Sequence, residues 1–303
     1  MTTITKTAER TVQANGIEIT YDTFGDPAGI PLLLVMGLGM QMTSWDERLC
    51  AQFAEKGFWV IRFDNRDVGR STHFDKAGPP NMLRMAAAGL LRLPMQSAYK
   101  LKDMAADAVG LLDVLGVTAV HVVGVSMGGM IAQEMAIRYP KRILSLTSIM
   151  STTGDTKLPQ PDLKMRMRLL KRAPADEKAY QDHVVELMKV LYGPKYTPDV
   201  NYTRQLAARN FKRGYYPVGV SRQLAAIIAS GNREPKLADL RLPTLVIHGD
   251  ADPLVPVECG RATARAIPHA KLMIIPGMGH ALPKEIWDEV VEAITAHAQT
   301  AAG

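Results

Sequence analysis

The sequence predicts an α/β protein in which an open, doubly wound and mostly parallel sheet is interrupted by an inserted helical cap. Six near-continuous apolar runs alternate with segments of helical periodicity, an arrangement typical of a parallel sheet with helices on both faces. The alternation stops after Ser151, and about 85 residues follow that have helical character but no comparable apolar run. These residues are predicted to form the cap.

The predicted strands begin with two short β-rich segments, 11–15 and 17–24, followed by a turn at Gly25-Asp26-Pro27. The six apolar runs then span residues 31–36, 58–64, 119–125, 143–150, 244–249 and 271–277. Runs without polar alternation are typical of strands that are buried on both faces, as in a parallel sheet. Helices must therefore cover both faces of this sheet.

Helices are predicted between these runs. In the segment 103–116, Asp103 can cap the first turn and Gly116 can end the helix. Further helices are predicted at 127–139, 256–266 and 284–300. Strands and helices that alternate in this way specify a doubly wound domain, in which ligands bind at the carboxyl edge of the sheet.

The predicted organisation is a core in two parts, residues 1–152 and 241–303, with the cap at residues 153–240 between them. The cap contains six of the nine tyrosines, which are Tyr180, Tyr192, Tyr196, Tyr202, Tyr215 and Tyr216. Two interpretations of these tyrosines stay open. They either half-bury their rings on a solvated helical lid or line the substrate site.

The formal net charge of +6 is concentrated in the cap, where residues 153–240 hold 16 Lys and Arg against 9 Asp and Glu. No nucleic-acid-binding motif accompanies this excess, and the basic residues are interspersed with apolar ones, so nucleic-acid binding is not expected. One basic cluster consists of Lys164, Arg166, Arg168, Lys171 and Arg172. It is either a solvated helix face or a surface that attracts anionic esters.

The N-terminal segment and the cysteines indicate a compartment. Lys6, Glu9 and Arg10 interrupt the apolar stretch that a secretory signal needs, and no uncharged apolar run reaches the roughly 18 residues of a membrane-spanning helix. Cys50 and Cys259 are too few for a disulfide framework and are expected to be buried thiols. Neither H-E-x-x-H nor another clustered ligand set predicts a metal site. We therefore expect a cytoplasmic protein without a membrane span.

A candidate nucleophile stands at Ser126, in the G-x-S-x-G sequence between the predicted strand 119–125 and the predicted helix 127–139. A sharp strand-to-helix turn forces the nucleophile into a crowded backbone conformation, which Gly124 and Gly128 relieve. The turn exposes the serine hydroxyl above the sheet and points the Met127 N–H toward developing negative charge. The alternative is a glycine-rich turn without chemical meaning.

A serine nucleophile requires a general base, because its hydroxyl is a weak nucleophile when protonated. His280 is the candidate base, since it directly follows the predicted strand 271–277 at the carboxyl edge of the sheet. His73 follows a loop and is a weaker candidate. The other histidines are expected in the core, at His121 and His248, or near the surface, at His183, His269 and His297.

The candidate acid lies in a short acidic segment after the predicted strand 244–249. Asp252 stands beyond the strand end, where its carboxylate can turn toward His280 Nδ1, and Pro253 stiffens this loop. The chain order Ser, Asp, His is typical of a nucleophile on this kind of strand-to-helix turn. Asp250 is the alternative acid and could otherwise cap the turn.

A second backbone donor for an oxyanion hole is expected in the loop Met36-Gly37-Leu38-Gly39, after the predicted strand 31–36. The Leu38 N–H is the candidate, beside the Met127 N–H. The two glycines let the backbone approach a ligand closely, although they also fit an ordinary tight turn. Nucleophilic catalysis of this kind needs no cofactor.

Together these residues resemble the α/β-hydrolase superfamily and, within it, the aclacinomycin methylesterase-like esterases. The resemblance is carried, in order over most of the chain, by PLLLVMG, VIRFDNRDVGRS, HVVGVSMGG, LPTLVIHGDADPLVP and IPGMGHALP. It implies the α/β-hydrolase fold, with Ser126, Asp252 and His280 at the triad positions and Leu38 and Met127 at the oxyanion-hole positions. This similarity favours Asp252 over the other aspartate of its loop.

The sequence departs from the superfamily pattern at two positions. Many members have His-Gly where this chain has Met36-Gly37, so the support that a histidine would give the oxyanion loop is missing. In the segment 64–71, which resembles the family's D-x-R-G-x-G-x-S, Asp67 takes the place of a glycine. We interpret the segment as structural.

The leading functional prediction is hydrolysis of a small-molecule carboxylic ester through an acyl-enzyme on Ser126, with deacylation by a water that His280 activates. The same triad resembles that of peptidases, carbon–carbon bond hydrolases and cofactor-free perhydrolases, which stay open as alternatives. Epoxide hydrolases and haloalkane dehalogenases of similar fold use an aspartate nucleophile, so Ser126 argues against them. A non-catalytic binding protein or receptor on the same scaffold is an alternative from a different class.

Overall fold

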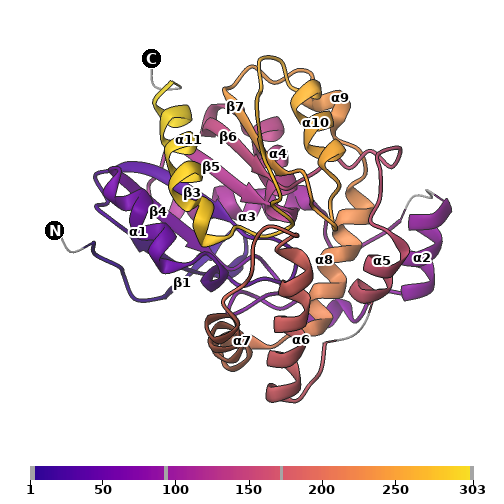
Figure 1. Cartoon of the computed structure of the whole chain (residues 1–303). Coiled ribbons are helices and arrows are strands. Elements are labelled where there is room, and N and C mark those ends of the chain that lie inside the picture. Colours follow the sequence, from indigo (N-terminus) through magenta and orange to yellow (C-terminus); the bar gives the residue numbers. More distant parts are fainter. Residues whose placement is uncertain (1–3, 92–94, 171–172, 301–303) are drawn as a thin grey trace.

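The described residues of the computed structural model, which are 4–91, 95–170 and 173–300, contain one sheet of eight strands. The strands are β1 (Arg10–Ala14), β2 (Ile17–Phe24), β3 (Ile30–Val35), β4 (Phe58–Phe63), β5 (Val120–Val125), β6 (Ile143–Ile149), β7 (Thr244–Gly249) and β8 (Lys271–Ile275). All eight lie where the sequence predicts strands (Figure 1).

The strand order is β1-β2-β4-β3-β5-β6-β7-β8. Pairings of β1 with β2 and of β2 with β4 are antiparallel, and all the others are parallel, so the sheet is mostly parallel as predicted. The chain runs from β3 to β4 on one side and then to β5 on the other side of β3. The carboxyl ends of β3 and β5 therefore form the switch point at which open α/β sheets bind their ligands.

Helices cover both faces of the sheet, and each face has its own apolar core. One core lies under α1 (Glu47–Glu55) and α11 (Trp287–Thr300). The other lies under α3 (Leu101–Val114) and α4 (Met127–Arg138), and α10 (Val257–Ala266) packs against β7 and β8. The central strands β3 to β7 are almost continuously buried because they lie between these two layers.

The helix predicted at 103–116 begins two residues earlier, at Leu101. Asp103 still caps this helix, but from inside its first turn, where its Oδ2 accepts the Lys100 N–H at 2.7 Å. Gly116 follows the helix with a φ of +70°, a left-handed conformation that glycine adopts without steric cost. The predicted stop is therefore correct, and the start differs because the capping carboxylate reaches backwards.

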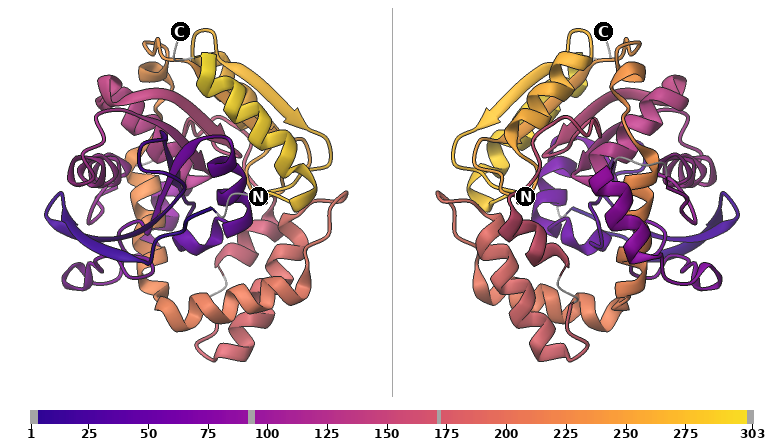
Figure 2. Two further views of the ribbon diagram at one scale, coloured as in Figure 1. Left: turned by 90° about the vertical axis from the view of Figure 1, so that its left-hand side faces the viewer. Right: turned by 90° about the vertical axis from the view of Figure 1, so that its right-hand side faces the viewer.

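Between β6 and β7 the described residues form helices and no strand, which confirms an inserted helical cap. Its helices are α5 (Leu163–Leu170), α6 (Glu177–Leu191), α7 (Val200–Gly214), α8 (Pro217–Ser230) and α9 (Glu234–Leu237). Figure 2 shows α6 and α7 below the sheet in both views, with α8 rising from them alongside it. The limits 153 and 240 stay a prediction.

A second insertion, between β4 and α3, contains α2 (Met82–Leu91), which lies beside α8.

Of the basic cluster in the cap, Lys171 and Arg172 lie outside the described residues, whereas Lys164 and Arg166 are exposed on α5. Cys50 and Cys259 are both buried free thiols, as predicted. Within the described part of the chain, no helix combines the length and apolar character that crossing a bilayer requires.

Candidate active site

Ser126 lies at the turn between β5 and α4 in a backbone conformation that residues with a Cβ rarely adopt. Its φ is 54° and its ψ is −120°. A Cβ on Gly124 would lie 2.2 Å from the Gly128 carbonyl oxygen, and a Cβ on Gly128 would lie 2.1 Å from the Val35 carbonyl oxygen. The strained turn thus has no room for side chains at positions 124 and 128, which is the crowding that G-x-S-x-G predicts.

His280 brings Ser126 and Asp252 into one hydrogen-bonded chain. Its Nε2 lies 2.9 Å from Ser126 Oγ, and its Nδ1 lies 2.7 Å from Asp252 Oδ2. Ser126 follows β5, Asp252 follows β7 and His280 follows β8. The carboxyl edge of the sheet therefore brings them together from distant parts of the sequence. The Asp252 side chain is fully buried and the His280 side chain is 7 % exposed.

The surroundings of Asp252 keep its carboxylate charged and oriented. Its Oδ1 accepts the N–H groups of Leu254 and Val255 at 2.8 Å each, which leaves Oδ2 for His280. Burial alone would raise the pKa of Asp252, but the charge of His280, hydrogen bonds from His280 and Val255 and the nearby His248 imidazole hold this pKa below its usual value. An ionised Asp252 holds the proton of His280 on Nδ1, which leaves Nε2 free to accept a proton.

Asp250, the alternative acid, lies elsewhere. It is exposed, and its Oδ1 accepts the Gly277 N–H at 2.6 Å. Asp250 therefore anchors the loop that carries His280 without a hydrogen bond to the imidazole.

The remaining histidines differ in part from the sequence prediction. His121 and His248 are buried, as predicted, and His73 stacks on Tyr216 of the cap with ring centroids 3.9 Å apart. His297, predicted near the surface, is only 3 % exposed. It lies seven residues after Val290 in α11, on the same helix face, which packs on the sheet.

The loop after β3 places its backbone beside Ser126. A Cβ on Gly37 would lie 3.3 Å from Ser126 Cβ, so the backbone that leads into Leu38 lies against the candidate nucleophile. Met127 is the first residue of α4, and its N–H therefore has no acceptor within the helix. Where the superfamily histidine is absent, the Met36 carbonyl oxygen accepts the Asn65 Nδ2–H at 3.0 Å.

Asp67, the residue in place of a family glycine, joins the core to the cap. Its φ is 67°, the left-handed region that explains a glycine here in relatives. The buried carboxylate accepts Arg222 Nε–H and Nη2–H at 2.8 and 2.7 Å and the Tyr99 hydroxyl at 2.6 Å. Sequence reasoning missed Arg222 and Tyr99, and the only local signal was an acid where glycine is usual.

The cap tyrosines mostly contact other protein groups. Tyr180, Phe211 and Tyr215 form an aromatic cluster inside the cap, with ring centroids 4.8 to 5.4 Å apart. Tyr202 lies under the Arg48 guanidinium at 4.8 Å, and Tyr216 contacts His73 across the boundary between cap and core. These contacts favour the half-buried interpretation for four of the six tyrosines.

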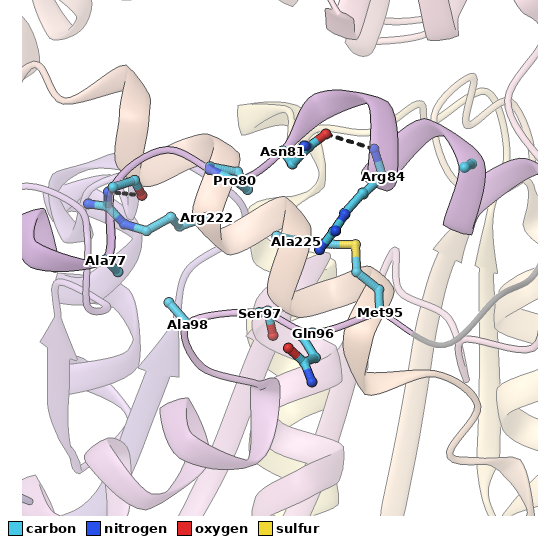
Figure 3. A pocket seen from close by; sticks show the side chains of 12 residues that line it. Ala77, Pro80, Asn81, Arg84, Met95, Gln96, Ser97, Ala98, Arg222 and Ala225 are labelled. Carbon is cyan, nitrogen blue, oxygen red and sulfur yellow. Dashed lines mark hydrogen bonds between the residues drawn. The ribbon is translucent and has the colours of Figure 1, made fainter.

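A cavity of about 750 Å³ lies on the side of α8 that faces α2 (Figure 3). Arg222 and Ala225 line it from α8, and Arg84 lines it from α2. Neither Ser126 nor His280 is among its lining residues. The cavity is therefore separate from the candidate active site.

Comparison with known proteins agrees with this fold and with the resemblance in the motifs. Residues 30–285 match the family described as the alpha/beta hydrolase fold. Rhodomycin D methylesterases from Streptomyces sp. (strain C5) and Streptomyces peucetius are 30% and 29% identical to this chain, over 96% of it and 98% of their own length. The solved structure of a thermophilic esterase from Thermogutta terrifontis is similar with a TM-score of 0.70 and 24% identity, covering 97% of this chain and 99% of that one. The protein belongs to the α/β hydrolase fold family.

Proposed function

We propose that this α/β hydrolase is a serine esterase in which Ser126 is the nucleophile, His280 the general base and Asp252 the residue that orients His280. The observation that carries the proposal is the continuous chain from Ser126 Oγ through the imidazole to Asp252, with contacts of 2.9 and 2.7 Å. Both distances are within reach of proton transfer or strong hydrogen bonding. The strained turn and the buried acid support the proposal of nucleophilic catalysis.

In the first half of the reaction, His280 Nε2 takes the proton of Ser126 Oγ as this oxygen attacks the ester carbonyl carbon. The resulting oxyanion accepts the N–H groups of Leu38 and Met127. When the tetrahedral intermediate collapses, the bond to the alcohol oxygen breaks and His280 returns the proton to this oxygen. An alcohol leaves and the acyl group remains on Ser126.

In the second half, His280 takes a proton from a water molecule, whose oxygen attacks the acyl carbon. Collapse of the second intermediate returns the proton to Ser126 Oγ and releases the carboxylic acid. Asp252 stabilises the imidazolium in both halves, because its buried carboxylate faces the Nδ1–H.

We propose small-molecule methyl esters as the first substrates to test, since the two Streptomyces relatives are named methylesterases. The purified protein would be assayed with methyl esters of increasing acid size and with amides and lactones of matched acids. Esters should be hydrolysed faster than the amides. A preference for amides would contradict the esterase assignment and favour a peptidase.

Covalent labelling tests the nucleophile directly. A fluorophosphonate should add to the wild-type protein at Ser126, as intact-protein and peptide mass spectrometry would show, and Ser126→Ala should lose both labelling and ester turnover. Unchanged labelling of Ser126→Ala would exclude Ser126 as nucleophile. A wild-type protein that neither reacts nor turns over any ester would favour a non-catalytic binding role.

A further inference from the structure

The loop that offers the Leu38 N–H is fixed at three points, and one of them belongs to the cap. On one side the Met36 carbonyl oxygen is held by Asn65, and within the loop the Met40 N–H donates to the Gly37 carbonyl oxygen at 3.3 Å. On the other side the Gly39 N–H donates to Gln223 Oε1 at 2.8 Å. Gln223 lies on α8, so the cap reaches the loop next to Leu38 directly.

Gln223 uses both ends of its amide in this contact. Its Nε2 donates to the Arg66 carbonyl oxygen at 2.8 Å, and the side chain is fully buried. The two partners fix the orientation of the amide, because its oxygen must face an N–H and its nitrogen must face a carbonyl. Loss of this side chain would leave a part-buried donor at Gly39 and a buried acceptor at Arg66 without this partner.

The loop also packs directly against α8 at Gly39. Gly39 has a φ of +68°, and a Cβ at this position would lie 2.9 Å from Val220 Cγ2 of α8. The backbone of the loop thus contacts the cap helix too closely for any larger residue. The side chain of Met36 has no N–H or O–H with which to orient the loop from within.

We propose that Gln223 is a positioning residue for the oxyanion hole: from the cap, it holds the loop 36–40 in the orientation in which the Leu38 N–H faces the reacting carbonyl. The inference rests on the proposed serine esterase function. It means that the oxyanion hole is complete only when α8 is docked on the core. The cap then contributes to the chemical step as well as covering the site.

The test is Gln223→Met, which keeps the length of the side chain and removes both hydrogen bonds. An oxyanion donor acts mainly in the transition state, so a misplaced Leu38 N–H should lower kcat by about 10- to 100-fold while KM changes less than about threefold. Phenylboronic acid, whose tetrahedral adduct on serine imitates the intermediate, should lose affinity by a similar factor. A purely structural role of Gln223 would not change the boronate affinity and kcat in parallel.

Thr43→Val is the matched control, because Thr43 Oγ1 donates at 2.6 Å to Asn210 Oδ1 of α7 in another buried contact between core and cap. It should leave kcat and boronate affinity within about threefold of wild type. Gly39→Ala provides a second variant, since its Cβ would push the loop off Val220, and it should show the same selective loss of kcat. Near wild-type kcat in the folded Gln223→Met or Gly39→Ala protein, or an equal loss in Thr43→Val, would overturn the inference. Failure of the esterase proposal itself would show separately, as absence of labelling and turnover in the wild-type protein.

Discussion

Two regions of the molecule are buried and closely packed but are held by different kinds of contact. One is the turn around Ser126, and the other is the cap seam, which consists of the contacts of Arg222 and Gln223 with the core. At the turn the contacts are backbone to backbone, between Gly124, Gly128 and Val35. At the seam they join side chains to partners 155 and 157 residues away in the sequence. Backbone crowding leaves a short glycine motif in the sequence, whereas a distant side-chain pair leaves no local pattern.

The largest expected effect is on kcat and concerns Asp252 and Asp250, which lie at the carboxyl edge of the sheet with the turn around Ser126. Asp252→Asn should lower kcat by about 10⁴, because an amide cannot hold the productive tautomer of His280 or stabilise its charge. Asp250→Asn should lower kcat less than about tenfold, since the amide oxygen still accepts the Gly277 N–H. Steady-state kinetics on an ester that the wild-type protein hydrolyses would measure both variants. A larger loss in Asp250→Asn would transfer the orienting role to Asp250.

The sequence predicted the sheet side of the molecule well, because its signals are local. The strands β3 to β7 are near-continuous apolar runs, and Ser126, Asp252 and His280 follow β5, β7 and β8, so parallel topology alone brings them to one edge. The expectation of burial on both faces is wrong for β8, which is partly exposed because it is the edge strand. The start of α3 was placed at Asp103 although the helix begins at Leu101, because a carboxylate can cap from the first turn. His297 was placed near the surface, although its position seven residues after Val290 puts it on the face of α11 that packs on the sheet.

The cap seam could not be predicted in the same way. Asp67 was recognised as a departure from a glycine, but nothing in the sequence connects it with Arg222. Gln223 lies in α8, and nothing in the sequence of this helix distinguishes its side chain from that of an ordinary helical glutamine. Such pairs depend on how the cap docks, which is a property of the three-dimensional packing and not of any sequence window.

The second prediction tests whether the seam supports the fold. Arg222→Met leaves the carboxylate of Asp67 buried without its countercharge, since the two side chains are 2 % and 0 % exposed. Breaking a buried pair in this way typically lowers the free energy of unfolding by about 3–5 kcal/mol. Arg204→Met, which breaks an exposed pair with Asp182 within the cap, should cost less than about 1 kcal/mol. Urea unfolding of the three proteins would compare them, and equal losses would mean that the buried pair adds nothing to stability.

A double variant sharpens the same point. Asp67→Gly together with Arg222→Met removes both charges and relieves the left-handed backbone at position 67. It should unfold at a higher urea concentration than Arg222→Met alone, because no uncompensated charge stays buried. If the double variant is less stable than Arg222→Met alone, Tyr99 and the backbone suffice to stabilise the Asp67 carboxylate when Arg222 is absent.

The smallest expected effect is a loss of stability at low pH, and it concerns the interior of the sheet. There His121 lies in β5, the strand that leads to Ser126. Burial lowers the pKa of His121 to about 4, and the neighbouring His297 acts in the same direction. The unfolded chain binds a proton near pH 6.5, whereas the folded protein does so only near pH 4, so stability falls as the pH falls through this window. The loss from this residue should be on the order of 3 kcal/mol by pH 4, and it is absent above about pH 7.

His121→Asn removes this titration and keeps a polar group opposite Ser145, which contacts His121 Nδ1 at 2.8 Å. The free energy of unfolding of this variant, measured with urea from pH 7 to pH 4, should decline less steeply than that of the wild-type protein, even if the variant is less stable at pH 7. His269→Asn is the matched control, because His269 is exposed and its left-handed φ of 62° suits asparagine. The control should keep the wild-type slope. Parallel slopes in all three proteins would mean that His121 does not contribute to the loss of stability in acid.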